Sequence, residues 1–485
     1  MTDLHFRSAS DLSRMIRRRE IGSAELTDHF IAWIEKHDPK INAVVARDFD
    51  GARKAAKAAD AALARGELQG PLHGLPFTIK DAYEVAGLTS TGGNPVWKDH
   101  VPARSATAIE RLQRAGAIVF GKTNVPYLSG DLQSFNEIYG TTNNPYALDC
   151  GPGGSSGGSA AALAAGFTAA EFGSDIGGSI RTPAHLCGVF GHKPSYGIVP
   201  KRGHLGPAPG NLHESDLSVA GPLARSAEDL GLLLDIAAGP GWADAAGWKL
   251  DLPPARAARP RDLRVAVWIE DSFCDIDRES AALLTDAARA LEAAGAHLDW
   301  QARPDFTLAE ITETYLVLLH SQTGAGMPDS VRARWAEIRR NAAPDDRSHQ
   351  VLQAIGGTMN VAEQLVWKER QAQLRRKWQD FFKSYDVVLA PVLMRPAFEH
   401  DHQSNWHKRV LDVNGIQRHY MDVLIWAGPA VVSYLPASVA PVGLTSEGKP
   451  VGIQIIGPHL EDRTTIAVAG MFEEILGGFK PPKGW

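Results

Sequence analysis

Apolar positions in the first part of the chain recur with the period of a helix. Within residues 8–65, Leu26, Phe30 and Ile34 stand four positions apart, which places their side chains on one helical face. Residues 52–64 form an alanine-rich run, and alanine favours a helix as well. We therefore expect the chain to begin with helices.

After residue 65, short apolar runs alternate with helical stretches. A short apolar run between turn signals is typical of a buried strand, and helices between such strands are typical of α/β proteins. The expected strands are residues 75–81, 118–120, 167–172, 263–268, 297–300, 386–390, 437–442 and 451–456, and the expected helices are residues 107–115, 159–165, 280–294, most of 307–384 and 462–476. This order predicts an α/β fold, in which one large domain has a central mixed β-sheet that both ends of the chain feed and that helices cover on both faces.

Composition indicates an ordinary globular protein. Hydrophobic residues make up 44% of the chain and charged residues 22%, and the net charge of −6 argues against binding of nucleic acid. Three cysteines cannot form a disulfide framework in 485 residues, which indicates a reducing compartment. No apolar run is long enough to cross a membrane. We expect a cytoplasmic protein that binds neither nucleic acid nor a membrane.

Two glycine-serine clusters, at residues 153–158 and 177–179, stand out from this background. Glycine loses more chain entropy on folding than other residues, so two such clusters indicate a special backbone requirement. Consecutive free N–H groups beside the hydroxyl of Ser179 suit a nucleophile for acyl transfer that lies in its own oxyanion hole.

Other interpretations of the first cluster are a flexible linker, a phosphate-binding loop and a nucleophile elbow centred on Ser155. A linker is disfavoured because a helix-forming run follows directly, and a phosphate loop because no Gly-Lys-Ser/Thr motif follows. An elbow requires a buried strand just before it, and residues 145–150 make a poor one.

Lys80 is the unusual residue of the strand expected at residues 75–81. A lysine that closes an apolar run is commonly an exposed strand end. If Lys80 is buried instead, desolvation lowers the pKa of its amine and makes a neutral base available. Spacing alone reveals no Ser-His-Asp triad, so a lysine base for a serine nucleophile is considered.

Several motifs in this order resemble those of the amidase signature family. They are GLPFTIKD at residues 74–81, GGSSGGS at 153–159 and GSDIGGSIRTPA at 173–184, with further similar motifs at 191–197, 221–226 and 450–457. The resemblance covers essentially the whole chain and is weakest between residues 239 and 432.

This resemblance implies a Ser-cisSer-Lys triad and an amidase activity. Ser179 would attack the carbonyl carbon, and Ser155, held by a cis peptide bond after Gly154, would relay a proton between Ser179 and Lys80. The implied oxyanion hole consists of the backbone N–H groups of Ile176, Gly177, Gly178 and Ser179. Hydrogen bonding around the triad is assigned to Ser156, Ser174 and Asp175, and fixing of the loop to Arg181. The mechanism requires neither a metal nor an organic cofactor.

The resemblance also indicates where substrate binds. In this family the segment that holds Tyr127, Gly130, Asp131, Leu132 and Gln133 lines the pocket, and Tyr127, Leu132 and Trp426 favour an uncharged, partly apolar substrate. We expect a catalytic core in residues 60–235 of a single 1–485 domain, and a more variable part in residues 239–432 that shapes the pocket.

The leading functional hypothesis is a free-standing serine hydrolase that cleaves the C–N bond of a small-molecule amide. It extends to aryl amides, carbamates (urethanes) and esters, because these share acyl-enzyme chemistry. The alternative is the amidase subunit of a glutamine-dependent amidotransferase, which the replacement of the Ser-Arg-x-Gly-Leu passage by residues 200–207 weakens. A homodimer is expected by analogy with the family. A catalytically silent scaffold is a third hypothesis, disfavoured because all three triad positions are intact.

Two side-chain clusters offer competing chemistry. His400, His402 and His407 could hold a metal, but their spacing fits no strong zinc pattern, and a polar loop is the simpler interpretation. Cys187 with His185 or His192 could form a Cys-His nucleophile, although packing around the second glycine cluster explains these residues equally well.

Overall fold

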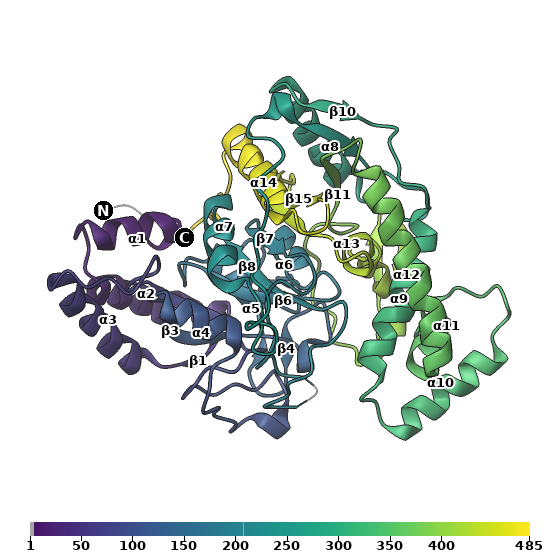
Figure 1. The fold of residues 1–485 in the computed structure, drawn as a ribbon. Coiled ribbons are helices and arrows are strands. Elements are labelled where there is room, and N and C mark those ends of the chain that lie inside the picture. The colour runs from purple at the N-terminus through teal and green to yellow at the C-terminus, as the bar shows by residue number, and fades with distance from the viewer. Residues whose placement is uncertain (1–3, 207) are drawn as a thin grey trace.

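A computed structural model of the chain describes residues 4–206 and 208–485 (Figure 1). Pro207, in the passage that departs from the amidotransferase pattern, lies outside the described residues. The chain begins with helices α1 (Ala9–Arg17), α2 (Ser23–His37) and α3 (Phe49–Ala64), as the helical periodicity predicts. Among the described residues, no helix combines the length and the apolar character that crossing a membrane requires.

The N-terminal part has its own small sheet. Strands β1 (Val44–Arg47), β3 (Ile118–Thr123) and β2 (Pro76–Lys80) lie in the order β1-β3-β2, with β2 parallel to β3, and α4 (Thr107–Arg114) connects β2 to β3. Every residue of β2 is buried. The strand-helix-strand order predicted here is confirmed, but this unit does not join the main sheet.

The main sheet has eight strands in the order β10-β9-β11-β15-β14-β7-β8-β6. Strands β10, β9 and β11 run parallel to one another and the remaining neighbours are antiparallel, so the sheet is mixed as expected. The strands are β6 (Glu171–Asp175), β7 (Phe190–Lys193), β8 (Val219–Ala224), β9 (Arg264–Val267), β10 (His297–Asp299), β11 (Val387–Pro391), β14 (Ala437–Leu444) and β15 (Pro450–Ile456). The expectation that both ends of the chain feed it is wrong, since its first strand begins at Glu171.

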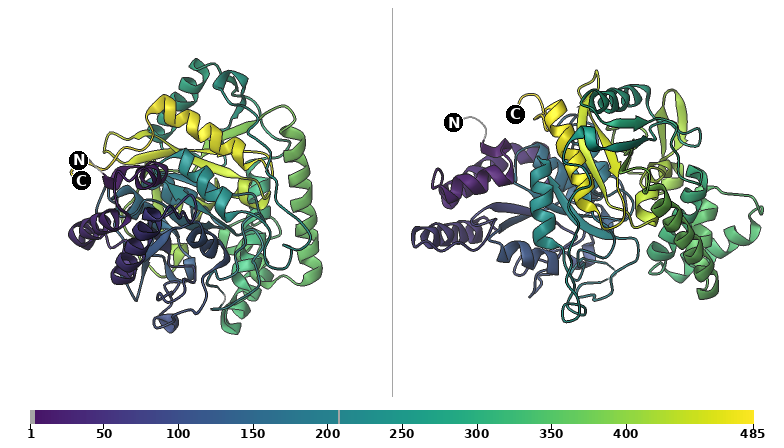
Figure 2. Two further views of the ribbon diagram at one scale, coloured as in Figure 1. Left: turned by 60° about the vertical axis from the view of Figure 1, so that its left-hand side comes forward. Right: turned by 45° about the horizontal axis from the view of Figure 1, so that its top comes forward.

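Helices cover this sheet on both faces (Figures 1 and 2). Helices α5 (Gly157–Ala164) and α6 (Arg181–Leu186) pack together, and α7 (Ala227–Ala237), α8 (Arg278–Ala293) and α14 (Asp462–Leu476) form a second group. All residues of α5 are buried, which explains why it consists of Gly, Ser, Ala and Leu alone. The single α/β domain is therefore as predicted.

A helical part extends to one side of the sheet, drawn in green in Figure 1. It contains α9 (Leu308–Gly324), α10 (Asp329–Asn341), α11 (His349–Thr358) and α12 (Val361–Phe381). The remaining elements are α13 (Gly428–Val432), the two-stranded sheets β4 (Phe135–Asn136) with β5 (Gly140–Thr141) and β12 (Val410–Val413) with β13 (Ile416–His419), and short 3-10 helices at Leu4–Phe6, Asp38–Lys40, Pro95–Trp97, Tyr127–Ser129, Pro260–Asp262, Trp406–Lys408 and Tyr420–Leu424.

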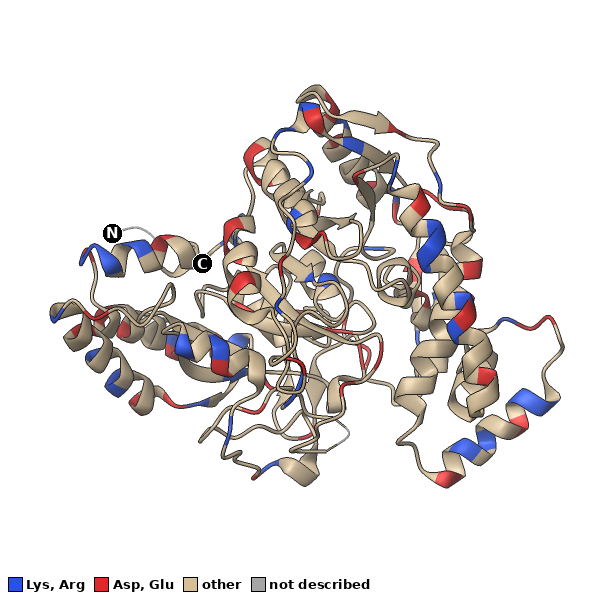
Figure 3. Cartoon of the chain, in the orientation of Figure 1, with Lys and Arg blue, Asp and Glu red and all other residues tan. Residues whose placement is uncertain are grey.

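Strand β2 of the small sheet lies against β6 of the main sheet. Thr78 joins the two, because its N–H donates to Thr168 Oγ1 (3.0 Å) and its hydroxyl to Glu171 Oε1 (2.6 Å). Charged residues otherwise lie mostly on the outer helices (Figure 3). The junction thus brings the end of β2, with Lys80, to the end of β6, with Asp175.

Candidate active site

Lys80 closes strand β2 in the interior of the protein. Lys80 is 0% exposed, and its Nζ lies 2.7 Å from Ser155 Oγ and 3.0 Å from Ser174 Oγ. Burial lowers the pKa of the Lys80 amine to about 7, although the negative charges of Asp175 and Glu171 act in the opposite direction. The alternative of an exposed strand end is therefore wrong, and a neutral amine is available near neutral pH.

Ser155 stands in the loop that leads into α5, and the peptide bond between Gly154 and Ser155 is cis, as the resemblance implies. Residues 151–158 are all buried, so the linker interpretation of this cluster is wrong. The nucleophile elbow needs a strand directly before Ser155, and the described residues between Thr141, where β5 ends, and Ser155 form none. The cluster is a fixed loop at the N-terminus of a buried helix.

Ser179 lies in the loop between β6 and α6 and is 5% exposed. The backbone N–H of Ser156 donates to the carbonyl oxygen of Ser179 over 3.1 Å, so the two serine-bearing loops lie side by side. Lys80, Ser155 and Ser179 thus come from three separate elements and meet at one place. Their catalytic roles remain a prediction.

Asp175 and Arg181 fix the loop that follows β6. The Asp175 carboxylate accepts hydrogen bonds from the N–H groups of Gly178 (2.9 Å) and Ile180 (3.1 Å) and pairs with Arg181 at 2.9 Å. Arg181 also donates to Gln454 Oε1 on β15. Burial by itself would raise the pKa of Asp175, but the charge and hydrogen bonds of Arg181 outweigh it and hold this pKa at about 2. The expected role of Arg181 in fixing the loop is confirmed.

The hydrogen bonds of this loop narrow the set of expected oxyanion donors. The Gly178 N–H donates to Asp175 and is therefore already committed, so Gly178 must be removed from the set. The other three N–H groups find no acceptor among the residues that the structure describes, and they belong to Ile176, Gly177 and Ser179. These three amides remain candidates for stabilising an oxyanion.

Two residues distant in the sequence close over the same loop. Tyr315 on α9 donates its hydroxyl hydrogen to the Ile176 carbonyl over 3.0 Å, across 139 positions of the chain. Leu424 lies against Gly177, since a Cβ there would come within 3.1 Å of Leu424 Cδ2. No motif or periodicity in the sequence indicated either residue.

The residues expected to bind substrate lie next to the loop of Ser155. A Cβ added at Gly154 would come within 2.7 Å of the backbone oxygen of Asp131, so the two segments touch through their main chains. Tyr127 is 55% exposed, whereas Leu132 is buried. Gly130 continues the same turn, and its N–H donates to the Tyr127 carbonyl. Their contact with a substrate remains a prediction.

Asp131 and Gln133 have protein partners in the C-terminal part of the chain. Asp131 pairs with Arg409 at 2.6 Å and accepts a hydrogen bond from the Tyr420 hydroxyl, also at 2.6 Å. Gln133 makes two hydrogen bonds, of 2.9 and 3.0 Å, with the backbone of Asp401. These side chains therefore anchor residues 401–420 beside the triad. Arg409 and Tyr420 carried no sequence signal, because the contact crosses more than 270 positions.

Trp426, the third apolar candidate for the pocket, is 1% exposed. Its ring packs edge to face on Trp268, with ring centroids 6.0 Å apart. Trp426 therefore supports the core beneath the site.

The three histidines considered as metal ligands have separate partners. His400 bonds to Asn143, His402 stacks on Phe135 with centroids 3.9 Å apart, and His407 bonds to Gln353. The polar-loop interpretation of this passage is the one that these contacts favour.

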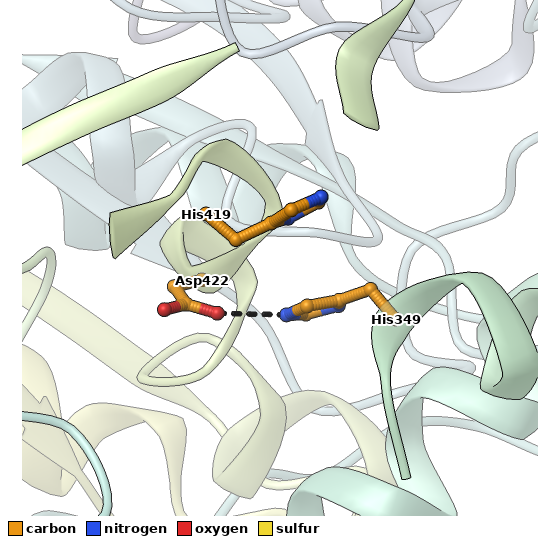
Figure 4. A group of neighbouring side chains, drawn as sticks. All are labelled: His349, His419 and Asp422. Atoms are coloured by element: carbon orange, nitrogen blue, oxygen red, sulfur yellow. Dashed lines mark hydrogen bonds and ion pairs between the residues drawn. The ribbon is translucent and has the colours of Figure 1, made fainter. Parts of the chain in front are cut away.

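A different group, His349, His419 and Asp422, brings ligand-type atoms within 4.8 Å of one another (Figure 4). His349 bonds to Asp422 at 2.8 Å, and His419 Nδ1 accepts a hydrogen bond from the N–H of Met421 at 3.1 Å. With Nδ1 occupied as an acceptor, Nε2 of neutral His419 carries the proton, so this arrangement is a hydrogen-bonded cluster of side chains.

The alternative Cys-His nucleophile receives no support. Burial raises the pKa of the Cys187 thiol far above its usual range, which disfavours the reactive thiolate. His185 lies between the backbone oxygens of Gly452 and Arg395, and His192 bonds to Asp462 and Ser438. Both imidazoles thus have structural partners.

A mixed α/β fold with a buried lysine and two serine-bearing loops at one point defines a serine hydrolase. A family model described as Amidase matches residues 25–466 of the chain. The chain belongs to this family, the amidase signature enzymes, and it is an amidase, a hydrolase that acts on carbon–nitrogen bonds other than peptide bonds.

Relatives and solved structures match over nearly the full length. The A-type component of the glutamyl-tRNA(Gln) amidotransferase of Synechococcus sp. (strain CC9902) is 34% identical over 483 residues, with 95% of this chain and 94% of the relative covered. The same component in Geobacillus thermodenitrificans (strain NG80-2) is 31% identical over 487 residues, with 96% of each chain covered. The crystal structure of a bacterial aryl acylamidase superimposes with a TM-score of 0.82 at 26% identity, and 98% of this chain and 97% of that chain are covered.

Proposed function

We propose that the protein cleaves a C–N amide bond through an acyl-enzyme on Ser179. The observation that carries this proposal is the 2.7 Å contact between Lys80 Nζ and Ser155 Oγ in a fully buried position beside the loop of Ser179. A lysine whose pKa is lowered to about 7 is a suitable general base near neutral pH.

In the first half of the reaction, Ser179 Oγ attacks the carbonyl carbon of the amide. Its proton passes to Ser155 Oγ, which gives its own proton to the neutral amine of Lys80. The negative charge that develops on the carbonyl oxygen is met by the free amides of Ile176, Gly177 and Ser179. Such a donor contributes about 3–4 kcal/mol to the stability of the transition state.

The second half returns the proton. The tetrahedral intermediate collapses, the C–N bond breaks, and the protonated Lys80 supplies a proton through Ser155 to the departing nitrogen. Water then attacks the acyl-enzyme, its proton follows the same path to Lys80, and Ser179 leaves with a proton that Lys80 returns through Ser155. The chain's own residues account for every proton in this cycle.

Labelling with a serine-directed fluorophosphonate tests the assignment of the nucleophile. We expect one adduct, mapped to Ser179 by peptide mass spectrometry, and no adduct and no turnover in Ser179→Ala. The exposed Ser404→Ala is the matched control and should behave like the parent. An adduct on Ser155, or acyl-enzyme in Ser179→Ala, contradicts the proposal.

A second candidate concerns the fate of the released nitrogen. Curated relatives that are 30–34% identical over their full length are named as the A-type component of glutamyl-tRNA(Gln) amidotransferase, which favours the alternative of an amidotransferase component over aryl amides or carbamates as natural substrates. In that role the amide would be glutamine, and partner chains would receive the ammonia.

The two candidates differ in what the purified chain can do. A free-standing hydrolase turns over anilides, aliphatic amides, carbamates or p-nitrophenyl esters without partners, and a panel of these with glutamine ranks its substrates. An amidotransferase component releases little ammonia from glutamine until its partner chains are added. High turnover of simple amides by the single chain, with no stimulation by partners, contradicts the second candidate. Sedimentation of the same preparation tests the expected homodimer.

The more variable part, residues 239–432, is proposed to shape the substrate pocket. Tyr315, Leu424 and Arg409 all belong to it and reach the loops of Ser179 and Ser155. Exchange of this part between relatives of different specificity should move the substrate preference with it, and an unchanged preference contradicts the proposal.

A further inference from the structure

A chain of hydrogen bonds continues beyond Lys80 on the side away from Ser155. Lys80 Nζ donates to Ser174 Oγ over 3.0 Å, and Ser174 Oγ lies 2.8 Å from Nε2 of His204. The four side chains Ser155, Lys80, Ser174 and His204 thus form one connected row. The proposed cycle uses the first two only.

His204 belongs to residues 200–207, the passage in which this chain departs from the amidotransferase pattern. The main chain of this passage is pinned beside the end of β2, because Leu205 N–H donates to the Ala82 carbonyl (2.7 Å) and Glu84 N–H to the Gly203 carbonyl (2.8 Å). His204 also pairs with Tyr83 through an isolated β-bridge, and their rings meet edge to face at 5.0 Å. The imidazole is therefore held in one position.

The surroundings of His204 determine which of its nitrogens carries the proton. Burial, together with the positive charges of Lys201 and Lys80, lowers the pKa of His204 well below its ordinary value, so the ring is neutral. The backbone of Leu205 also hydrogen-bonds the imidazole. Because Nε2 faces Ser174, the nitrogen that donates to Leu205 is Nδ1. Nε2 then presents a lone pair to the Ser174 hydroxyl.

We propose that His204 is a positioning residue that fixes the direction of the Ser174 hydroxyl, so that the lone pair of the Lys80 amine is left for Ser155. This inference rests on the proposed function, because it presupposes that Lys80 acts as the base. It assigns to His204 a role in the reaction that acts through Ser174 and not through contact with substrate.

The number of hydrogens and lone pairs on these groups decides the direction of each hydrogen bond. A neutral lysine amine has two N–H donors and one lone pair, and a serine hydroxyl has one hydrogen. If Ser174 gives its hydrogen to His204, its oxygen can only accept from Lys80, and the lone pair of Lys80 faces Ser155. If no acceptor stood at position 204, Ser174 could donate to Lys80 and occupy the lone pair that the reaction needs.

The other polar groups around Ser174 do not replace His204. Tyr83 lies beside this hydroxyl, but its own hydrogen is donated to the Gly173 carbonyl at 2.6 Å, and a phenol oxygen is a weaker acceptor than an imidazole nitrogen. Glu171 and Asp175 act on Lys80 through their charge, without a hydrogen bond to its amine. Nε2 of His204 is therefore the acceptor that fits the Ser174 hydrogen.

A double-mutant cycle between residues 204 and 174 tests the inference. His204→Leu keeps the volume but removes the acceptor, whereas His204→Gln places an amide oxygen where Nε2 stands. We expect His204→Leu to lower kcat about tenfold or more with little change in KM, a size typical of residues in one hydrogen-bond network. His204→Gln should recover kcat to within a few-fold of the parent. The exposed His213→Leu serves as the matched control and should not change kcat.

The background of Ser174→Ala separates positioning from general support of the fold. Without the Ser174 hydroxyl there is nothing for His204 to direct, so His204→Leu should lower kcat less than twofold in that background. An equal loss in both backgrounds, or failure of His204→Gln to recover activity, overturns the inference.

Fluorophosphonate labelling of the same variants separates the role of His204 from the role of Ser179. Labelling of Ser179 in the parent supports the proposed function independently of residue 204. If the parent is labelled and His204→Leu retains full kcat, the inference alone is wrong. If Ser179 is not labelled in an active parent, the proposed function is wrong and the inference is overturned with it.

Discussion

The amine of a lysine in water is protonated at neutral pH, and at Lys80 the protein removes that water. Within the described part of the chain, no carboxylate forms an ion pair with this buried amine, which instead contacts two hydroxyls, those of Ser155 and Ser174. Lys122, which is equally buried, has the opposite solution, because Asp81 pairs with it at 2.9 Å. The two neighbouring lysines show that a partner, and not burial alone, determines whether a buried amine is available as a base.

The pKa of Lys80 predicts the pH dependence of activity. With a pKa of about 7, the amine is mostly protonated below that pH and mostly neutral above it, so activity should rise through pH 7 and level off above pH 8. Single-turnover rates between pH 6 and pH 9 measure this directly. Lys80→Ala should lose about two to four orders of magnitude in rate and with it the acid limb. A flat profile of the parent, with chemistry rate-limiting, contradicts the base.

Close approach of main chains makes Gly154 a second sensitive residue. A Cβ there would lie within 2.7 Å of the Asp131 oxygen and 2.8 Å of the Gln133 nitrogen, both backbone atoms that cannot move independently. Gly154→Ala should therefore abolish turnover or prevent folding.

Gly151 offers the matched control in the same loop. The nearest atom to a Cβ at Gly151 is His400 Nδ1 at 3.8 Å, an ordinary contact, so Gly151→Ala should retain activity. Turnover and circular dichroism of both variants are the measurements. Equal behaviour of the two would show that the approach at Gly154 is not limiting.

At the scale of elements, the site depends on where strands end. β2 ends at Lys80 and β6 ends at Asp175, and the loop that carries Ser179 begins directly afterwards. The sequence predicted β2 almost to the residue, but it placed the next strand at residues 167–172, four positions before β6 begins. Small residues before Glu171 have no strand-like alternation that could have located this boundary.

Loss of Arg181 should destabilise the loop between β6 and α6. Arg181→Ala leaves the buried carboxylate of Asp175 without its partner, which costs about 3–5 kcal/mol in the free energy of unfolding. Urea denaturation at neutral pH measures it. Because Arg181 lowers the pKa of Asp175 to about 2, its contribution is complete above pH 4 and is lost as the pH falls toward 2.

The matched control for this experiment is the exposed pair of Arg259 with Asp262. Arg259→Ala should change the free energy of unfolding by about 1 kcal/mol or less. An Arg181→Ala variant as stable as Arg259→Ala would contradict the role assigned to the buried pair.

At the scale of the whole molecule, the site is assembled from segments that the sequence could not place together. Local periodicity and motifs predicted the α/β class and brought out Lys80, Ser155 and Ser179. The contacts of Arg409 and Tyr420 with Asp131 cross about 280 positions and depend on how the chain folds back, so no local pattern carries them. The same limitation explains why the N-terminal strands were assigned to the main sheet.

The pair of Asp131 and Arg409 should behave as a unit. Either single alanine variant leaves a buried charge without a partner and should lower the free energy of unfolding by about 3–5 kcal/mol, whereas the double variant removes both charges and should lose less than the sum. Thermal and urea denaturation of the three variants measure the coupling. Strict additivity would show that the two residues stabilise the protein independently.

Helix α5 sets a limit for anyone who wishes to redesign this enzyme. Its residues are small and fully enclosed, and a methyl group at Gly158 would come within 2.4 Å of the Asn124 nitrogen. Libraries that randomise this helix should yield mostly inactive clones. Diversity is better introduced at the rim, around Tyr127 and the turn that follows it, where side chains already reach solvent.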